Sequence, residues 1–350
     1  MNKLTIAVLF GGCSSEYAVS LQSAHAVLTH LDPARYTAIP VGITREGRWF
    51  RFLGDYDRIA QDTWHREPSC LTPAMLSPDR GIHGLVEFPA SGARSTPLDA
   101  VFPVLHGKNG EDGTVQGLAE LAGLPLIGCG CLASALCMDK DRAHKLARLA
   151  GVDVPESFVM GAGESLEGLE RRVQALGYPV FVKPVRAGSS FGVTRVTGPE
   201  GLEPAVRLAL EHDSEAILEQ AIEGFEVGCA VLGNDTLTCG RVDEIELAGG
   251  FFDYQEKYTL QSAHIHMPAR IDPDTERRIR QDACAVYRAL GCTGFARVDL
   301  FLTPQGRIVF NEVNTIPGFT AHSRYPSMMQ GVGLSFSQVL DRLIELGVRG

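Results

Sequence analysis

Two carboxylates, an amide and a guanidinium lie at short spacing near the C-terminal end of the sequence. Arg297 lies two residues before Asp299, and Glu312 lies two residues before Asn314. Between the pairs, Thr303–Gly306 reads Thr-Pro-Gln-Gly, which is typical of a β-turn and predicts a hairpin. Because side chains alternate along a strand, each pair shares a face. Oxygen ligands of this kind suit Mg²⁺, which needs few protein ligands when substrate phosphates supply the rest.

The register of this hairpin decides whether the four side chains share one face. With a four-residue turn, Arg297 pairs with Glu312 and Asp299 pairs with Phe310, so that all four polar side chains project from the same side. A three- or five-residue turn would reverse this parity and weaken the argument. The alternative to a metal site is a solvated hairpin face that carries an ion pair.

Two lysines have surroundings that favour phosphate binding. Lys183 ends the apolar strand 180–183 and precedes a Gly/Ser-rich loop, Gly188–Gly192. Such a loop can close over phosphates with its backbone N–H groups, with a lysine as the point charge. Lys140 starts a helix after an apolar run at 133–138. Either lysine alone would be read as a surface residue, but the two together with the acidic hairpin favour a shared phosphate site.

Two loops of the N-terminal part could bind a small substrate. The first, Gly11–Glu16, joins a strand at 6–10 to a helix at about 19–31. It is either a packing feature of that junction or a site at a helix N-terminus where Glu16 holds an ammonium group. The second, His106–Gly113, follows a strand at 100–105, at the end of a parallel strand where α/β sheets place ligands.

Elements around these residues predict an α/β and α+β protein of three domains. We expect a parallel-sheet α/β domain over 1–128, a central α+β subdomain over 129–222 and a C-terminal domain over 223–350. The stretch 55–95 is polar and rich in proline, so we expect an irregular insertion or lid there. The other elements are expected as strands at 38–43, 193–196 and 216–219 and helices at 139–150, 201–211, 273–290 and 334–347.

Composition excludes several classes of protein. The 350 residues carry 32 Lys+Arg and 42 Asp+Glu, a net charge of −10 that disfavours binding to nucleic acid or to an anionic membrane surface. The apolar run at 6–10 is too short for a signal peptide, and no run is long enough to span a bilayer, so we expect a cytoplasmic protein. Nine cysteines without a C-x-x-C pair predict neither disulfide nor structural metal.

Seven motifs follow one another along the chain, namely Phe10-Gly11-Gly12-x-Ser14-x-Glu16, His106-Gly107-x-x-Gly110-Glu111-Asp112-Gly113, Met138-Asp139-Lys140, Val182-Lys183-Pro184, Gly188-Ser189-Ser190, Arg297-x-Asp299 and Asn311-Glu312-x-Asn314-Thr315-x-Pro317-Gly318. Taken in this order, they resemble the D-alanine–D-alanine ligase family of ATP-grasp enzymes, from residue 6 to about residue 345. The region 50–95 and the segment 226–233 are similar to the vancomycin-resistance branch, particularly its D-alanine–D-serine ligases.

The resemblance implies a role for each group of residues in an ATP-dependent ligase that releases ADP and phosphate. Two Mg²⁺ ions, for which Mn²⁺ can substitute, would bind the hairpin ligands Asp299, Glu312 and Asn314. ATP would contact Lys140, Lys183, Ser190, Glu219, Glu226 and Lys257. Glu16 and His106 would bind the first D-alanine, and Arg297 and Gly318 would stabilise the tetrahedral intermediate. Ser189 and Tyr258 would take part in closing a lid over about 247–266.

The resemblance also implies a binding site for the second substrate, made by Phe252, Ser323 and Arg324. Ser323 would hold its carboxylate, and Phe252 with Arg324 would make a roomier, more polar pocket that favours D-serine over D-alanine. Alternatively, Arg324 pairs with a nearby carboxylate and points away. Tyr258, where the depsipeptide-forming branch has histidine, favours an amino acid over D-lactate. We expect a homodimer that acts in peptidoglycan precursor synthesis and vancomycin resistance. A catalytically inactive relative would lack the metal ligands, which this chain retains.

Overall fold

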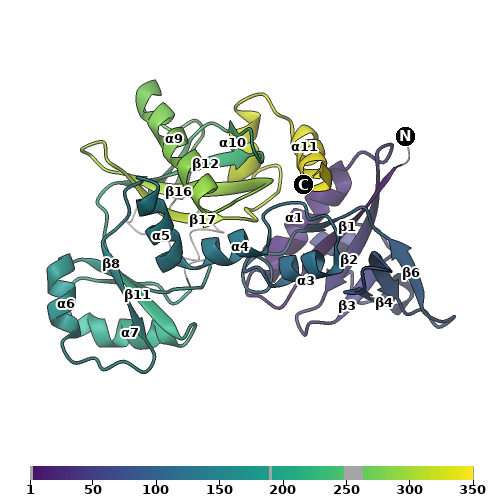
Figure 1. The fold of residues 1–350 in the computed structure, drawn as a ribbon, viewed down its shortest axis with the longest axis horizontal. Coiled ribbons are helices and arrows are strands. Elements are labelled where there is room, and N and C mark those ends of the chain that lie inside the picture. The colour runs from purple at the N-terminus through teal and green to yellow at the C-terminus, as the bar shows by residue number, and fades with distance from the viewer. Residues whose placement is uncertain (1–2, 189–190, 248–262, 350) are drawn as a thin grey trace.

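The computed structural model describes residues 3–188, 191–247 and 263–349, in which three β-sheets organise the chain. Figure 1 shows them as an N-terminal lobe, a small central lobe and a C-terminal lobe. This mixed architecture is the expected α/β and α+β class. None of the helices in the described part of the chain has the length and apolar character to cross a bilayer.

The N-terminal lobe is built on a seven-stranded sheet in the order β6-β5-β4-β3-β2-β1-β7. β1 pairs in parallel with β2 and β7, as the sequence predicts, and its residues from Ile6 to Phe10 are fully buried. Because both faces of β1 are covered, its sequence is continuously apolar instead of alternating. Its elements are β1 (Leu4–Gly11), α1 (Tyr17–His30), β2 (Tyr36–Ile43), β3 (Trp49–Phe52), α2 (Asp57–Ala60), η1 (Pro68–Cys70), β4 (Leu71–Leu76), β5 (Gly84–Glu87), β6 (Arg94–Pro97), β7 (Ala100–Pro103) and α3 (Thr114–Ala122).

The expectation of an irregular insertion over 55–95 is wrong. This stretch contains α2, η1, the strands β4 and β5 and the first half of β6, and these strands extend the N-terminal sheet in antiparallel pairing. A fully buried carboxylate, Glu87, holds the extension together by accepting hydrogen bonds from Arg51, Arg94 and Thr96. Buried carboxylates are tolerated when they are paired in this way. The strands in this stretch were missed because its sequence is polar.

The central lobe is an antiparallel four-stranded sheet, β10-β9-β11-β8, covered by α6 and α7. Lys183 lies on β9 and Glu219 on the adjacent β11, so the sheet places their side chains close together. The elements of this part of the chain are α4 (Cys131–Met138), α5 (Lys140–Leu149), β8 (Ser157–Gly161), α6 (Leu169–Leu176), β9 (Val180–Pro184), β10 (Thr194–Val196), η2 (Pro199–Gly201), α7 (Leu202–Leu210) and β11 (Glu215–Gln220).

The C-terminal lobe is a six-stranded sheet with the path β15-β14-β12-β16-β17, and β13 pairs with β12. Apolar side chains of α4, α5 and α9 pack on one face of this sheet. The domain boundaries at 128 and 222 stay a prediction. The elements are β12 (Phe225–Leu232), β13 (Thr238–Cys239), β14 (Asp243–Leu247), β15 (Ala263–His266), α9 (Pro273–Ala289), β16 (Phe295–Leu302), β17 (Ile308–Asn314), α10 (Arg324–Gln330) and α11 (Phe336–Arg349).

Aromatic side chains join the N-terminal and C-terminal lobes. Figure 1 shows α11 beside α1 of the N-terminal lobe, and both helices contribute to one apolar core with β1 and β7. In that core the Phe295 ring lies 6.2 Å from Phe102, 5.5 Å from Phe319 and 5.5 Å from Tyr325, measured between ring centroids. These edge-on contacts add to the burial of apolar area and fix the two lobes against each other.

We expect Phe295→Ala to lower the free energy of unfolding by about 3–5 kcal/mol, because it removes a buried ring at the centre of this junction and leaves a cavity. Phe88→Ala, at a ring that is 45% exposed, is the control and should change it by less than about 1 kcal/mol. Urea unfolding followed by circular dichroism measures both. Equal losses for the two variants would contradict a packed junction at Phe295.

Candidate active site

The register of the β16–β17 hairpin differs from the predicted one, yet it preserves the shared face. Arg297 pairs with Asn314 and Asp299 with Glu312, whereas Leu300 pairs with Phe310. The turn has five residues between the paired strands, which alone would reverse the parity. A β-bulge after Asp299 inserts one extra residue, Asn311, in β17 and reverses the parity again. The predicted pairing was therefore wrong, but the four polar side chains still lie on one face.

The bulge has a specific partner on α5. The backbone carbonyl of Asn311 accepts a hydrogen bond from His144 Nε2 at 2.9 Å. Because that carbonyl can only accept, Nε2 carries the proton, and burial lowers the pKa of His144 so that the ring stays neutral. The backbone N–H of Phe310, next to the bulge, donates to the carbonyl of Asp153 at 2.8 Å. These contacts outside the sheet hold the irregular strand in place.

The polar face of the hairpin is a connected set of hydrogen bonds. Arg297 donates from Nε and Nη2 to the two oxygens of Asp299 at 2.7 and 2.6 Å, and Asn314 Nδ2 donates to the same carboxylate at 2.9 Å. Two carboxylates directly opposite in neighbouring strands repel each other, so the Asp299–Glu312 pair favours a cation at this place.

This donor set fits Mg²⁺. In the described part of the chain no cluster of three His, Cys, Asp or Glu side chains is arranged to hold a metal by itself. Mg²⁺ does not need one, since it is commonly bound by one or two carboxylates together with substrate phosphates. Asp299, Glu312 and Asn314 are the residues that would hold it, as expected from the sequence.

Two cavities meet at this face. The larger, of about 760 Å³, and the smaller, of about 290 Å³, share Lys140, Ala187, Glu226 and Glu312 in their walls. Both volumes are typical of small-molecule sites. Lys183 and Glu219 line only the larger cavity, whereas the smaller is lined by Glu16, His106, Arg297, Asn314, Gly318, Ser323 and Arg324. The arrangement suits a phosphorylated substrate and a small polar substrate that meet beside Glu312 and Lys140.

The large cavity is lined by buried charges. Lys183 Nζ lies 2.6 Å from Glu219 Oε2, and Lys140 Nζ donates to the carbonyl of Ala187 at 2.6 Å. Burial acts to raise the pKa of Glu219, but the charge and the hydrogen bond of Lys183 outweigh it and the pKa is lowered. Glu219 Oε1 is buried, accepts no hydrogen bond from the described residues and lies 3.8 Å from His144 Nδ1. Because the two side chains are paired, a ligand that contacts both Lys183 and Glu219 must place two of its atoms close together, one at each side chain.

Glu16 lies where the lobes meet around the small cavity. It precedes α1 and is 9% exposed. A Cβ on Gly107 or Gly188 would lie 2.9 or 2.8 Å from Glu16 Oε1, so both glycines allow their loops to approach the carboxylate. The loop after β7 and the loop after β9 thus reach the same carboxylate, and its predicted binding of an ammonium group stays a prediction.

His106 connects two lobes. Its Nδ1 donates to the carbonyl of Ile316 at 2.8 Å, and its Nε2 accepts from the Ser23 hydroxyl at 3.1 Å. Burial, with a contribution from Arg297, lowers the pKa of His106 to about 4 and keeps the ring neutral. The ring lines the small cavity, and its predicted approach to a substrate carboxylate stays a prediction.

Arg324 pairs with carboxylates, which is one part of the alternative that the sequence left open, but it does not point away from the cavity. Its guanidinium donates from Nε and Nη2 to Asp243 at 2.7 and 2.8 Å and from Nη1 to Glu226 at 3.0 Å. It still lines the small cavity, beside Ser323. Ser323 Oγ accepts the backbone N–H of Thr320 at 3.0 Å. Arg324 therefore connects the wall of the small cavity to that of the large one.

Part of the expected lid and five of the predicted site residues lie outside the described residues. Of the expected lid over about 247–266, Leu247 is the last residue of β14 and residues 263–266 form β15. The remaining predicted site residues lie outside the described residues, namely Ser189, Ser190, Phe252, Lys257 and Tyr258.

Three residues of the site were not predicted. His144 and Asp243 had no distinguishing sequence feature, and Glu111 was noted only as part of a motif. Glu111 accepts the backbone N–H groups of Gly107 at 2.8 Å and Ile316 at 3.2 Å, so it joins the loops after β7 and β17. Burial and the charge of Glu16 raise the pKa of Glu111 to about 8. Its place in the His106–Gly113 loop was the only available signal.

Comparison with known proteins places this geometry in a family. The family model described as D-ala D-ala ligase N-terminus matches residues 5–129, and the one described as D-ala D-ala ligase C-terminus matches residues 147–345. The chain belongs to the D-alanine–D-alanine ligase family. It is thus a ligase with the ATP-grasp fold of that family, and the resemblance found in the sequence is confirmed.

Relatives within the D-alanine–D-alanine ligase family include vancomycin resistance proteins. The chain is 45% identical to a putative D-alanine–D-lactate ligase of Streptomyces coelicolor, over 100% of this chain and 99% of that one. It is 43% identical to the vancomycin B-type resistance protein VanB of Enterococcus faecalis, over 99% of each chain. The solved structure of the VanG D-Ala:D-Ser ligase from Enterococcus faecalis is 56% identical, with a TM-score of 0.93 over 99% of each chain.

We expect Glu312→Gln to lower kcat by about 100-fold or more, because it removes a charge that holds the cation without changing the shape of the side chain. Phosphate release from ATP in the presence of D-alanine, followed across Mg²⁺ concentrations, measures this. The control is Glu156→Gln, at a carboxylate whose side chain is 68% exposed, which should leave turnover unchanged. Near-normal turnover of Glu312→Gln at saturating Mg²⁺ would contradict the metal assignment.

Proposed function

We propose that this chain joins D-alanine to D-serine in an ATP-dependent reaction that supplies a peptidoglycan precursor and confers vancomycin resistance. The observation that carries this proposal is the junction of the two cavities at Glu312, Lys140 and Glu226. It provides one space for ATP and one for two small amino acids. The 56% identity to a D-Ala:D-Ser ligase and the similarity to vancomycin resistance proteins support the choice of substrate and pathway.

The first step is attack of the first D-alanine carboxylate on the γ-phosphate of ATP, which gives an acyl phosphate and ADP. Glu16 would hold the ammonium group of that D-alanine, so that its carboxylate points toward the cavity junction. Lys140 and Lys183 would contact the phosphates, and Glu219 and Glu226 the adenine and ribose ends. Mg²⁺ bound at Asp299, Glu312 and Asn314 would offset the charge that develops on the transferred phosphoryl group.

The second step is attack of the second substrate's amine on the acyl phosphate carbonyl, with loss of phosphate. Arg297 and the backbone N–H of Gly318, which line the same small cavity, would stabilise the negative oxygen of the tetrahedral intermediate. The bidentate pair with Asp299 already fixes the Arg297 guanidinium in one orientation. A donor that is oriented before the reaction needs little reorganisation in the transition state.

Selection of D-serine would depend on the wall that carries Ser323 and Arg324. Asp243 and Glu226 hold Arg324 in place, so its contribution to this wall is a rigid one. A site built to hydrogen-bond a substrate hydroxyl rejects the analogue that lacks it. By the family resemblance, Phe252 would line the pocket of the second substrate and Tyr258 would favour an amino acid over D-lactate.

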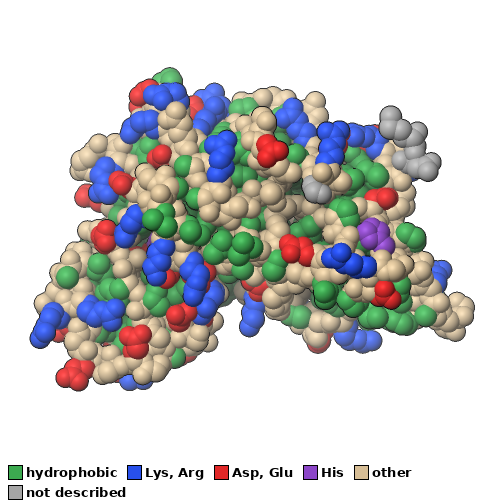
Figure 2. All heavy atoms as spheres, in the orientation of Figure 1, with side chains coloured by type: hydrophobic (Ala, Val, Ile, Leu, Met, Phe, Trp, Pro, Cys, Tyr) green, Lys and Arg blue, Asp and Glu red, His purple; other side chains and the backbone are tan. Residues whose placement is uncertain are grey.

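The remaining expectations are part of the same proposal. The cofactors are ATP and two Mg²⁺ ions, and Mn²⁺ can take their place. We further propose a cytoplasmic homodimer without nucleic-acid or membrane partners. Lys/Arg and Asp/Glu side chains are interspersed over the face shown in Figure 2, which agrees with the net charge of −10 in disfavouring a nucleic-acid surface.

We expect kcat/KM for D-serine to exceed that for D-alanine by about tenfold, with D-lactate used poorly near pH 6. Amino acids need a free amine, so their use should increase as the pH rises. The measurement is phosphate release with D-alanine and each second substrate at pH 6.0, 7.5 and 9.0. Preference for D-alanine would favour a plain D-alanine–D-alanine ligase, and efficient D-lactate use at pH 6 would favour a depsipeptide ligase.

A double variant tests the pocket itself. Phe252→Tyr with Arg324→Met should lower the ratio of kcat/KM values for D-serine and D-alanine by about tenfold. Because Arg324 also binds Glu226, the KM for ATP is measured in parallel to separate a nucleotide effect. Arg307→Met, at an exposed arginine paired with Asp153, is the matched control. An unchanged ratio in the double variant would refute the pocket argument.

A further inference from the structure

Two thiols of the C-terminal lobe lie unusually close together. The structure describes all nine cysteines as thiols. Among them, the Sγ atoms of Cys239 and Cys284 are 3.0 Å apart, and both residues are partly exposed. Cys239 is the last residue of β13 and Cys284 lies in the second half of α9, so the pair connects elements 45 residues apart. A second close pair, Cys137 and Cys292, is 3.5 Å apart and buried.

The close pair opens into a basic depression on the surface. Figure 2 shows several basic side chains, with acidic ones among them, over the region of α9. The depression has a volume of about 430 Å³, and besides the two thiols it is lined by Pro273, Glu276, Arg277, Arg280, Gln281 and Arg288. Arg277 pairs with Asp274 and Arg280 with Glu276, and Arg288 adds a further positive charge that makes the depression attractive to a small anion.

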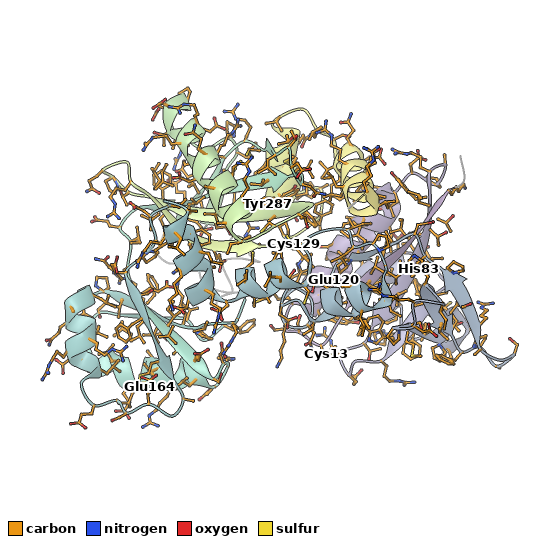
Figure 3. All side chains as sticks on the ribbon, in the orientation of Figure 1. Cys13, His83, Glu120, Cys129, Glu164 and Tyr287 are labelled. Atoms are coloured by element: carbon orange, nitrogen blue, oxygen red, sulfur yellow. The ribbon has the colours of Figure 1, made fainter. Side chains whose placement is uncertain are left out.

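This depression lies on the side of the sheet away from the catalytic residues. Val298 and Leu300 of β16 pack against α9, so the alternating Arg297 and Asp299 point to the opposite face. Tyr287 of α9, labelled in Figure 3, is buried against the same sheet and donates to the carbonyl of Gly233 at 2.8 Å. The thiol pair therefore belongs to a separate site.

We propose that Cys239 and Cys284 form a redox-active dithiol, which low-molecular-weight disulfides bearing carboxylates oxidise to an intramolecular disulfide. One cysteine thiolate attacks a sulfur of the reagent RS–SR, the S–S bond breaks and RS⁻ leaves. The second thiolate then attacks the mixed disulfide and expels the other RS⁻. The protein loses two electrons and two protons, and the reagent gains them as two thiols.

The surroundings set the pH dependence of this exchange. A hydrogen bond with Cys229 and burial raise the pKa of Cys239 to about 12, although Cys284 and Arg280 act to lower it. A hydrogen bond with Cys239 and burial likewise raise the pKa of Cys284, against the effect of Arg288 and Arg280. Because only the thiolate attacks, the exchange accelerates as the pH rises from 7 to 9.

The test treats the full chain with 3,3′-dithiodipropionate, an anionic disulfide, or with cystamine, a cationic one of similar size. Remaining thiols are then alkylated, and intact mass and peptide mapping follow the products. We expect a mass loss of about 2 Da with a crosslink between Cys239 and Cys284. With the exposed Cys13 as the reference thiol for each reagent, this pair should favour the anionic reagent over the cationic one about tenfold at low ionic strength.

Two variants and the activity of the oxidised wild type test the proposal further. Cys284→Ser should retain a mixed disulfide on Cys239, since no second thiol can resolve it. Arg288→Gln should reduce the preference for the anionic reagent. Phosphate release should be unchanged in the oxidised wild type, because the site lies away from the active site. Stable mixed disulfides in the wild type, a crosslink between Cys137 and Cys292 instead, or equal rates for the two reagents would overturn the proposal.

Discussion

One extra residue in β17 determines which side chains share the polar face of the β16–β17 hairpin. The bulge at Asn311 brings Asp299 opposite Glu312 and keeps Arg297 and Asn314 on the same side. Without it, the five-residue turn would direct one pair of polar side chains into the apolar core beneath the sheet. His144 Nε2 holds the bulge through the Asn311 carbonyl. A histidine of the neighbouring helix thus positions the carboxylates without being placed to bind the metal itself.

The rest of the site depends on how the lobes are fixed around that face. The central lobe contributes Lys183 and Glu219, and the N-terminal lobe contributes Glu16 and His106. Bonds to the loop after β17 come from both His106 and Glu111 of the N-terminal lobe. In Figure 3, Cys129 lies between the lobes and Glu164 at the far end of the central lobe. These bonds hold the loop after β17, which lines the small cavity, against the N-terminal lobe.

Much of the fold could be predicted from the sequence, because buried strands and helix ends carry local signals. The apolar run at 6–10 and the Gly11–Glu16 turn predicted β1 and the start of α1 correctly. The hairpin register could not be predicted, since a bulge depends on a contact with a distant helix. Strands β4 to β6 were missed because the paired carboxylate Glu87 and its arginines resemble a solvated loop in the sequence. The partners of Arg324 could not be predicted either, because Asp243 lies 81 residues away in the sequence.

We expect the bulged hairpin to hold the cation at the junction of the two cavities. Crystals grown with Mn²⁺ and a non-hydrolysable ATP analogue, measured near the manganese absorption edge, test this directly. Anomalous density should lie beside Asp299 and Glu312, with the triphosphate reaching it from the larger cavity. Manganese bound elsewhere, or nucleotide density that ends away from Glu312, would contradict this expectation.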